Sequence, residues 1–290
     1  MKRLIPFLFV LLVCLGIRCS GQGSDSPRVV PDVEFVRVGE MALRLDLHLP
    51  ARTPRAPLIV WVHGGAWRSG SRKDMPLVSL VEAGYAIASV DYRLSTQARF
   101  PAPVHDIKAA VRFLRSHGGT WSLPTKRILI AGDSAGGHLA ALVGVSNGSK
   151  ELEGALGANR TTSSDVQGIM SFYGGANLTT ILKQSTPHGL SVRVPALDLL
   201  LGGQPEAVPE LARLASPVFW VDGEDPPLLL LHGDQDPQMP VNQALELFSA
   251  YRSKRATVQL EIVPGAAHGG SVFYDSERMK VVKKFLRLHF

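Results

Sequence analysis

Cysteine is almost absent from this sequence. The 290 residues include only Cys14 and Cys19, both close to the N-terminus. We therefore expect a mature protein without disulfides and without a thiol nucleophile. Its stability must come from hydrophobic burial instead, and a chain of this length with 45% hydrophobic residues can bury a large single core.

Metal-binding patterns and basic clusters are also missing. No set of His, Cys, Asp and Glu has the spacing of metal ligands, and Gly132 to Gly137 lacks the Lys-Ser/Thr of a phosphate loop. The basic residues are scattered, so nucleic acid is not an expected partner. We predict no metal and no cofactor.

The first 23 residues have the order of a secretory signal peptide. Lys2 and Arg3 precede an apolar run from Leu4 to Ile17, and small and polar residues follow up to Gly23. The apolar run is short for a membrane span, although an uncleaved anchor is the alternative. A lipid on Cys19 would be a second alternative, which the preceding arginine disfavours. We expect export to the periplasm or beyond, with no stable membrane association after cleavage.

The mature part of the chain is expected to be one domain. Residues 24–32, rich in Ser, Gly and Pro, predict a flexible leader, and residues 33–290 predict a single α/β domain. Within it, residues 174–216 are less regular and carry several glycines and prolines. They are interpreted as a cap or loop insertion over the site. The sequence leaves the oligomeric state open.

Strand-length apolar runs alternate with helical patterns along the domain. Such alternation predicts right-handed crossovers and a mostly parallel sheet with helices on both faces, here preceded by an antiparallel hairpin. The predicted strands are 33–38, 43–49, 58–62, 85–90, 127–131, 166–172, 227–231 and 258–263; the predicted helices are 75–83, 103–117, 138–145, 241–252 and 275–288.

A G-x-S-x-G pattern stands between one of these strands and the helix after it. It reads Gly132-Asp133-Ser134-Ala135-Gly136. In this context the turn is sharp and lifts the serine hydroxyl above the sheet. A Cβ at either glycine would collide with neighbouring backbone. Ser134 is therefore the candidate nucleophile.

The partners of such a serine should follow other strands, because the carboxyl ends of parallel strands share one edge of the sheet. His63-Gly64-Gly65 follows strand 58–62, and the N–H groups of Gly64, Gly65 and Ala135 are the expected oxyanion donors. His63 itself is expected to brace the loop.

An acid and a base follow the last two strands. After 227–231 come Asp234 and Asp236, and we favour Asp236 as the orienting acid because Asp234 sits tightly in the turn. After 258–263 comes His268 among small residues, the expected base. The order Ser134, Asp236, His268 is that of α/β-hydrolases.

Several other residues have two interpretations. Trp67 is a candidate for the acyl or alcohol pocket. Asp133 is expected either to shape the pocket or to cap the helix. His138 is expected to pack or hydrogen-bond rather than act as a second base. Asp91, Arg93 and Asp106 are expected to form a structural charge network, with a substrate role as the alternative.

These motifs resemble a known family. His63-Gly64-Gly65-Ala66-Trp67, Asp91 to Ser95, Phe100 to Asp106 and Gly132 to Leu139 resemble hormone-sensitive-lipase-like α/β-hydrolases, above all the bifunctional feruloyl and acetyl xylan esterase branch. The resemblance runs from about Val33 to the C-terminus. It implies the α/β-hydrolase fold and the triad and oxyanion roles given above. Two departures, Ala66 in the glycine triplet and Met239 before Pro240, leave details of the pocket open.

The expected function is a secreted serine carboxylester hydrolase that forms an acyl-enzyme. Export and the resemblance favour acetyl or feruloyl esters of polysaccharides, or other small acyl esters, as substrates. An arylformamidase-like amidase is the first alternative, since that group resembles the same glycine and serine motifs. A catalytically silent binding protein is the second.

Overall fold

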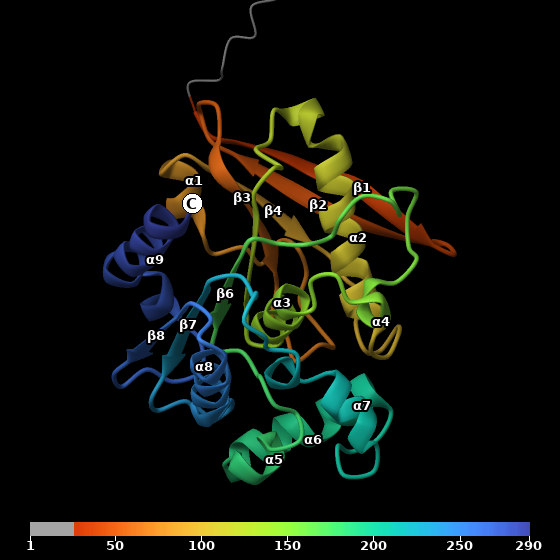
Figure 1. The fold of residues 1–290 in the computed structure, drawn as a ribbon, viewed down its shortest axis with the longest axis vertical. Coiled ribbons are helices and arrows are strands. Elements are labelled where there is room, and N and C mark those ends of the chain that lie inside the picture. Colours follow the sequence, from red (N-terminus) through yellow and green to blue (C-terminus); the bar gives the residue numbers. More distant parts are fainter. Residues whose placement is uncertain (1–25) are drawn as a thin grey trace, which may run out of the picture.

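The computed structural model describes residues 26–290. Eight strands form one sheet in the order β1-β2-β4-β3-β5-β6-β7-β8 (Figure 1). Strands β1, β2 and β4 pair antiparallel, and the pairs from β4 to β8 are parallel. The strands are β1 Arg28–Val38, β2 Met41–Leu49, β3 Arg55–Val62, β4 Tyr85–Val90, β5 Ile128–Asp133, β6 Gly168–Phe172, β7 Leu228–Gly233 and β8 Val258–Val263.

Helices cover both faces of this sheet (Figure 1). They are α1 Val78–Glu82, α2 Ala102–His117, α3 Ala135–Val145, α4 Lys150–Glu153, α5 Ile181–Gln184, α6 Pro187–Leu201, α7 Pro209–Leu214, α8 Asn242–Lys254 and α9 Ser276–His289, with 3-10 turns at Gly118–Trp121, Pro217–Phe219 and Ser271–Tyr274. The prediction of a mostly parallel sheet with an antiparallel hairpin at the start and helices on both faces is confirmed. None of the helices formed by residues 26–290 has the length and apolarity to cross a bilayer.

The core is divided by the sheet into two layers. In β3, Val60 and its neighbours two residues away pack toward α2 and α3, whereas Ile59 and Trp61 pack toward α1 and α9. This alternation is the two-residue period of a strand. A strand buried on both faces must be apolar at every position, which is why the run from Leu58 to Val62 is uninterrupted.

The chain enters the sheet earlier than the sequence predicted. Strand β1 begins at Arg28, so the second half of the segment expected to be a flexible leader is paired with β2, from Arg28 opposite Leu49 onward. The register shifts after Val30, which breaks the alternation that marks a strand in sequence. The predicted signal peptide lies outside the described residues.

The segment 174–216 is mainly helical, contrary to its irregular sequence. Helices α5, α6 and α7 lie together below the sheet in Figure 1. Thr186 caps α6 by accepting the N–H of Gly189 at 3.0 Å, and Pro187 occupies the first turn, where no N–H is needed. The proline that suggested a break therefore marks the start of a helix.

Candidate active site

Ser134 occupies a strained turn between β5 and α3. Its φ is 50°, a left-handed value that is uncommon for a residue with a Cβ. A Cβ at Gly132 would lie 2.6 Å from the carbonyl oxygen of Val62, and one at Gly136 would lie 2.5 Å from that of His63. The end of β3 thus packs directly on the turn, and both glycines are required by this close approach.

A chain of hydrogen bonds joins the three predicted triad side chains. The Oγ atom of Ser134 is 2.8 Å from Nε2 of His268, and Nδ1 of His268 is 2.7 Å from Oδ2 of Asp236. A proton on Nδ1, donated to the carboxylate, leaves Nε2 free to accept from the hydroxyl. The structure therefore brings together side chains that lie 32 and 134 residues apart in the sequence.

The Asp236 carboxylate is buried and held from several sides. Its Oδ1 accepts the N–H groups of Gln238 at 2.8 Å and Met239 at 2.7 Å. Burial raises the pKa of Asp236, but hydrogen bonds from His232, His268 and the backbone outweigh it and hold the pKa well below its usual range. This carboxylate is ionised wherever the protein is folded near neutral pH.

Asp234, the competing acid, faces away from the imidazole. Its side chain is exposed, and Oδ1 accepts the N–H of Gly265 at 2.7 Å. This bond ties the loop after β7 to the loop after β8. Asp234 thus aligns the two loops that carry Asp236 and His268, instead of closing a turn of its own.

The three predicted oxyanion donors are not equivalent. Ala135 is the first residue of α3, so its N–H has no acceptor within the helix. Gly65 and Ser134 both line the cavity that opens at the nucleophile. Gly64, in contrast, packs against the Asp133 carboxylate, since a Cβ built on it would lie 2.8 Å from Oδ2 of Asp133. The three positions therefore differ in their surroundings, and all three N–H groups remain candidate oxyanion donors.

Asp133 shapes the loop beside the nucleophile. Its carboxylate packs against Gly64 and lies 3.5 Å from the hydroxyl of Tyr173. Burial raises the pKa of Asp133 to about 6, against the lowering effect of neighbouring hydrogen-bond donors. Of its two predicted roles, shaping the pocket is the one that these contacts favour.

Trp67 does not reach the cavity. Its side chain is fully buried, and Nε1 donates to Nδ1 of His138 at 3.1 Å. The guanidinium of Arg193, from α6, lies 5.7 Å from its ring centre. The residue has a φ of 60°, and its indole belongs to the core layer that also contains side chains of α2 and α3. The proposed substrate contact of Trp67 is therefore not supported, and the ring instead joins α3 to α6.

His63 and His138 both have structural contacts. His63 is buried, stacks on Tyr92 with 4.4 Å between ring centres, and bonds the Gly64 carbonyl at 2.8 Å. His138 bonds the Ala215 carbonyl at 2.7 Å through Nε2, and burial lowers its pKa to about 4. Neither imidazole faces Ser134.

The residues of the expected charge network belong to two separate groups of ion pairs. Arg93 binds Asp106, whose side chain is fully buried, with a closest distance of 2.7 Å. Asp91 binds Arg72 at 2.6 Å instead. Arg72 also pairs with Asp46 at 2.8 Å, so the second group ties the antiparallel hairpin to the loop after β3.

A cavity of about 430 Å³ opens at Ser134 and His268. Several of its wall residues, among them Arg68, Ser69, Gln238 and Tyr173, were not predicted from the sequence. Tyr173 packs edge-on against the His268 ring at 5.0 Å between centres. It directly follows β6, so the strand-end rule that singled out Ser134 could have identified it.

The helices of 174–216 contact the acid loop. Thr186 donates to the carbonyl of Pro237, and Nε of Arg193 lies 3.4 Å from that of Gln238. Gly189 faces the same two carbonyls. Helix α6 therefore packs on the loop that carries Asp236, as a cap would.

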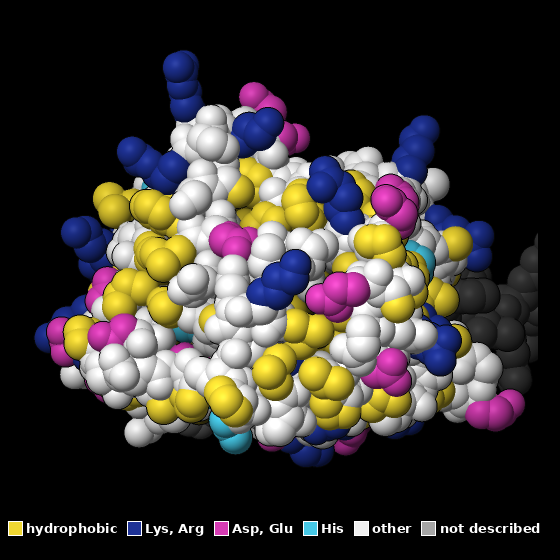
Figure 2. Space-filling model, turned by 90° about the horizontal axis from the view of Figure 1, so that it is seen from below, with side chains coloured by type: hydrophobic (Ala, Val, Ile, Leu, Met, Phe, Trp, Pro, Cys, Tyr) yellow, Lys and Arg dark blue, Asp and Glu magenta, His cyan; other side chains and the backbone are white. Residues whose placement is uncertain are grey.

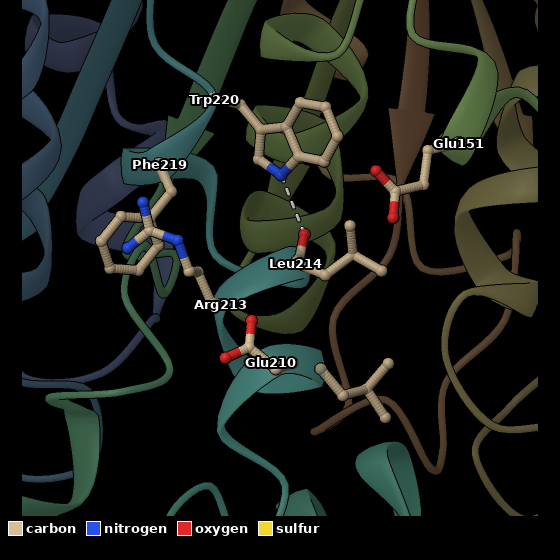
Figure 3. A pocket seen from close by; sticks show the side chains of 7 residues that line it. Glu151, Glu210, Arg213, Leu214, Phe219 and Trp220 are labelled. Atoms are coloured by element: carbon tan, nitrogen blue, oxygen red, sulfur yellow. Dashed lines mark hydrogen bonds between the residues drawn. The ribbon is translucent and has the colours of Figure 1, made fainter.

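A separate cavity of about 520 Å³ lies between α7, α4 and the turn at Pro217–Phe219 (Figure 3). Arg213 stacks on Phe219, and Trp220 donates to the Leu214 carbonyl at 2.9 Å. None of the side chains that line it is a serine, cysteine or histidine, so it offers no nucleophile or base. Among residues 26–290, no three His, Cys, Asp or Glu side chains are grouped so as to hold a metal ion.

Solved structures with the same architecture are esterases. The chain aligns with a truncated carbohydrate esterase from gut microbiota at a TM-score of 0.81 and 28% identity, covering 92% of this chain and 97% of that one. It aligns with esterase 2 of Thermogutta terrifontis, phosphonylated by sarin, at a TM-score of 0.71 and 25% identity, over 90% and 92% of the two chains. The predicted α/β-hydrolase fold is therefore confirmed.

Sequence comparison gives the family. Esterase LipC of Mycobacterium tuberculosis is 32% identical over 225 residues, which cover 75% of this chain and 54% of that protein. The chain spans about half the length of the curated relatives it matches. The BD-FAE family model matches residues 45–251, which include Ser134 and Asp236. With the α/β-hydrolase fold in place, this match confirms the resemblance seen in the motifs: the chain belongs to the BD-FAE family.

Proposed function

We propose that this protein hydrolyses carboxylic esters through an acyl-enzyme on Ser134. The observation that carries the proposal is the hydrogen-bond chain from Ser134 through His268 to Asp236, at 2.8 and 2.7 Å. The esterase names of the relatives and the phosphonylated neighbour support it. In this assignment Ser134 is the nucleophile, His268 the base and Asp236 the orienting acid.

In the first step Oγ of Ser134 attacks the ester carbonyl carbon and gives its proton to Nε2 of His268. The carbonyl oxygen becomes an oxyanion, which the N–H groups of Gly64, Gly65 and Ala135 stabilise. The imidazolium is stabilised by the ionised Asp236. It then gives the proton to the leaving alkoxide, so that an alcohol departs and the acyl group stays on Ser134.

In the second step water takes the place of the alcohol. His268 accepts a proton from water as its oxygen attacks the acyl carbon, and returns that proton to Oγ of Ser134 as the acid departs. The His268 imidazole thus serves as base and acid in turn, and no other proton carrier is needed.

The substrates we propose are acetyl or feruloyl esters of polysaccharides, or other small acyl esters. The likeness to a carbohydrate esterase supports this class. We also propose that residues 1–23 direct export, because Lys2, Arg3 and the following apolar run have signal-peptide order. The N-terminal sequence of protein recovered from outside the cytoplasm would test it, with an intact Met1 as the contrary result.

The nucleophile is tested with a fluorophosphonate probe and p-nitrophenyl acetate. We expect rapid labelling of Ser134 in the native protein. The variant Ser134→Ala should lose labelling and several powers of ten in kcat, with its circular dichroism unchanged. Labelling of a different residue, or retained turnover in Ser134→Ala, would contradict the assignment.

A substrate panel separates the esterase from its alternatives. Acetylated xylan and p-nitrophenyl acetate should be turned over, and N-formylkynurenine should not. Turnover of the formamide alone would indicate an amidase. A protein that neither reacts with the probe nor turns over any of these would indicate a binding function.

A further inference from the structure

A second cavity adjoins the one at Ser134. It has a volume of about 530 Å³, within the range of small-ligand sites. The two cavities share four wall residues, namely Gly65, Ser69, Asp133 and Tyr173. A ligand whose reacting carbonyl sits at Ser134 can therefore extend past Gly65 and Asp133 into this second space.

Oxygen atoms dominate the polar lining of this cavity. Asp74 and Asp133 line it, together with Tyr173 and Tyr274, whose hydroxyl oxygens are 2.8 Å apart. No lysine or arginine is among the residues that line it. Burial raises the pKa of Asp133 to about 6, so above that pH its carboxylate acts as an acceptor only.

Much of the acceptor capacity of Asp74 is unused by the protein. Asp74 is exposed, and its Oδ2 accepts one N–H, from Ser71 at 2.9 Å. A carboxylate can accept about four hydrogen bonds. The complementary ligand therefore carries several donors and no negative charge, and it has some apolar surface to place against Met75, Pro76 and the tyrosine rings. A neutral sugar, with donor hydroxyls and apolar C–H faces, meets each of these conditions.

We propose that this second cavity binds the sugar that carries the ester, with sugar hydroxyls donating to Asp74 and Asp133 while the acyl carbonyl lies at Ser134. The inference rests on the proposed esterase function and adds the alcohol side of the substrate to it. It assigns Asp74 as a specificity residue that lies outside the triad and its loops.

The test compares two glycosides that differ in charge. The substrates are a mono-O-acetylated neutral methyl pyranoside, the matching acetylated uronic acid, and p-nitrophenyl acetate, which has no sugar. The variant is Asp74→Asn, whose amide oxygen still accepts from Ser71. The control is Glu210→Gln, which removes one carboxylate from the separate cavity of Figure 3.

In the native enzyme we expect kcat/KM for the neutral glycoside to exceed that for the uronic acid by about tenfold or more, because two carboxylates face the sugar. Asp74→Asn should lower kcat/KM for the neutral glycoside about tenfold, mainly through KM, and should narrow the gap to the uronic acid. Any loss for p-nitrophenyl acetate should be much smaller. Glu210→Gln should leave all three rates within about twofold.

Equal losses on all three substrates in Asp74→Asn, or equal use of the neutral and acidic glycosides, would overturn the sugar site while leaving the esterase intact. A preference for an amino sugar over the neutral one would assign the cavity to a cation. Failure of even p-nitrophenyl acetate would overturn the esterase proposal together with this one.

Discussion

Asp234 and Asp236 are carboxylates on one loop, and their surroundings give them different tasks. Asp236 is buried against His268, and Asp234 is exposed and bonds Gly265. An amide at 236 would turn a donor toward the imidazole or lose the charge that stabilises the imidazolium. Asp236→Asn should therefore lower kcat by roughly 10³- to 10⁴-fold on p-nitrophenyl acetate.

The matched control is Asp234→Asn, the same chemical change two residues away. It should cost at most a few-fold in kcat, because an amide oxygen can still accept from Gly265. If instead Asp234→Asn were the more damaging change, the acid would have been assigned to the wrong residue.

Arg193 is a buried cation with few hydrogen-bond partners to offset the cost of burying its charge. Its Nε reaches the Gln238 carbonyl at 3.4 Å, while Nη1 and Nη2 bond no atom of the described residues. Burial lowers the pKa of Arg193 to about 10, although the nearby Asp236 charge favours the cation. Arg193→Met keeps the packing against Trp67 and removes the charge. We expect the free energy of unfolding to rise by about 1–3 kcal/mol in urea titrations.

Arg193→Ala provides the comparison, since it removes the charge and the packing together. It should lower the free energy of unfolding by about 2–4 kcal/mol through the space left beneath Trp67. A loss in Arg193→Met as large as that in Arg193→Ala would mean that attraction to Asp236 and Trp67 exceeds the cost of burying the charge.

At the scale of elements, the contact between β3, β5 and α3 holds the nucleophile turn. Gly136 lies within α3, where helix propensity alone would favour alanine by about 1 kcal/mol. The added Cβ would, however, meet the carbonyls of Val62 and His63. These are backbone atoms that cannot rotate away, so we expect the collision to dominate.

Gly136→Ala should lower the free energy of unfolding by about 3 kcal/mol or more and abolish fluorophosphonate labelling of Ser134. Gly119→Ala tests whether the effect belongs to the site, because nothing lies within 4 Å of a Cβ there and no positive φ is required. That variant should unfold within a degree or two of the native protein. Normal labelling in Gly136→Ala would show that the two strands and the helix can separate at little cost.

For the molecule as a whole, buried histidines determine how stability depends on pH. Burial lowers the pKa of His48, His63, His105 and His138, the last to about 4. Below pH 6.5 the unfolded chain therefore binds more protons at these sites than the folded protein, so stability falls as the pH falls. Asp133 has the opposite effect on stability. Because its pKa is raised, the folded protein binds more protons at this site than the unfolded chain between about pH 4 and 6, so this contribution to stability rises as the pH falls.

His138→Gln should reduce this pH dependence. A glutamine can accept from Trp67 and donate to the Ala215 carbonyl without titrating. Between pH 7.5 and pH 5 the native protein should lose about 2 kcal/mol more of its free energy of unfolding than the variant does. Urea unfolding at the two pH values measures the difference, and parallel pH profiles would contradict a neutral, buried His138.

On the side of the molecule that carries α5, α6 and α7, the outer surface shows no cluster of charges of one sign. Seen from below, basic and acidic side chains are interspersed with hydrophobic ones (Figure 2). Val194 and Leu199 of α6 are among the large apolar side chains that remain exposed, at 41% and 37%. Charge on this face therefore gives no preference for a ligand of either sign.

The order of strands and helices, and the sharp turn at Ser134, could be predicted from the sequence because they depend on near neighbours in the chain. Two-residue and helical periodicities mark the elements, and small residues permit the turn. Asp236 and His268 could be named because parallel strands bring their carboxyl ends to one edge. The same reasoning would have reached Tyr173 after β6.

The remaining features were decided only when distant segments packed together. The direction of the Trp67 ring depends on His138 and Arg193, which lie far along the chain, and Gly64 packs against Asp133 from the neighbouring strand β5. The start of β1 depends on its pairing with β2, and the cavity at Asp74 needs walls from four separate segments of the chain. Periodicity records which side of an element is buried. It does not record which atoms meet there, because burial and partner are properties of the assembled layers.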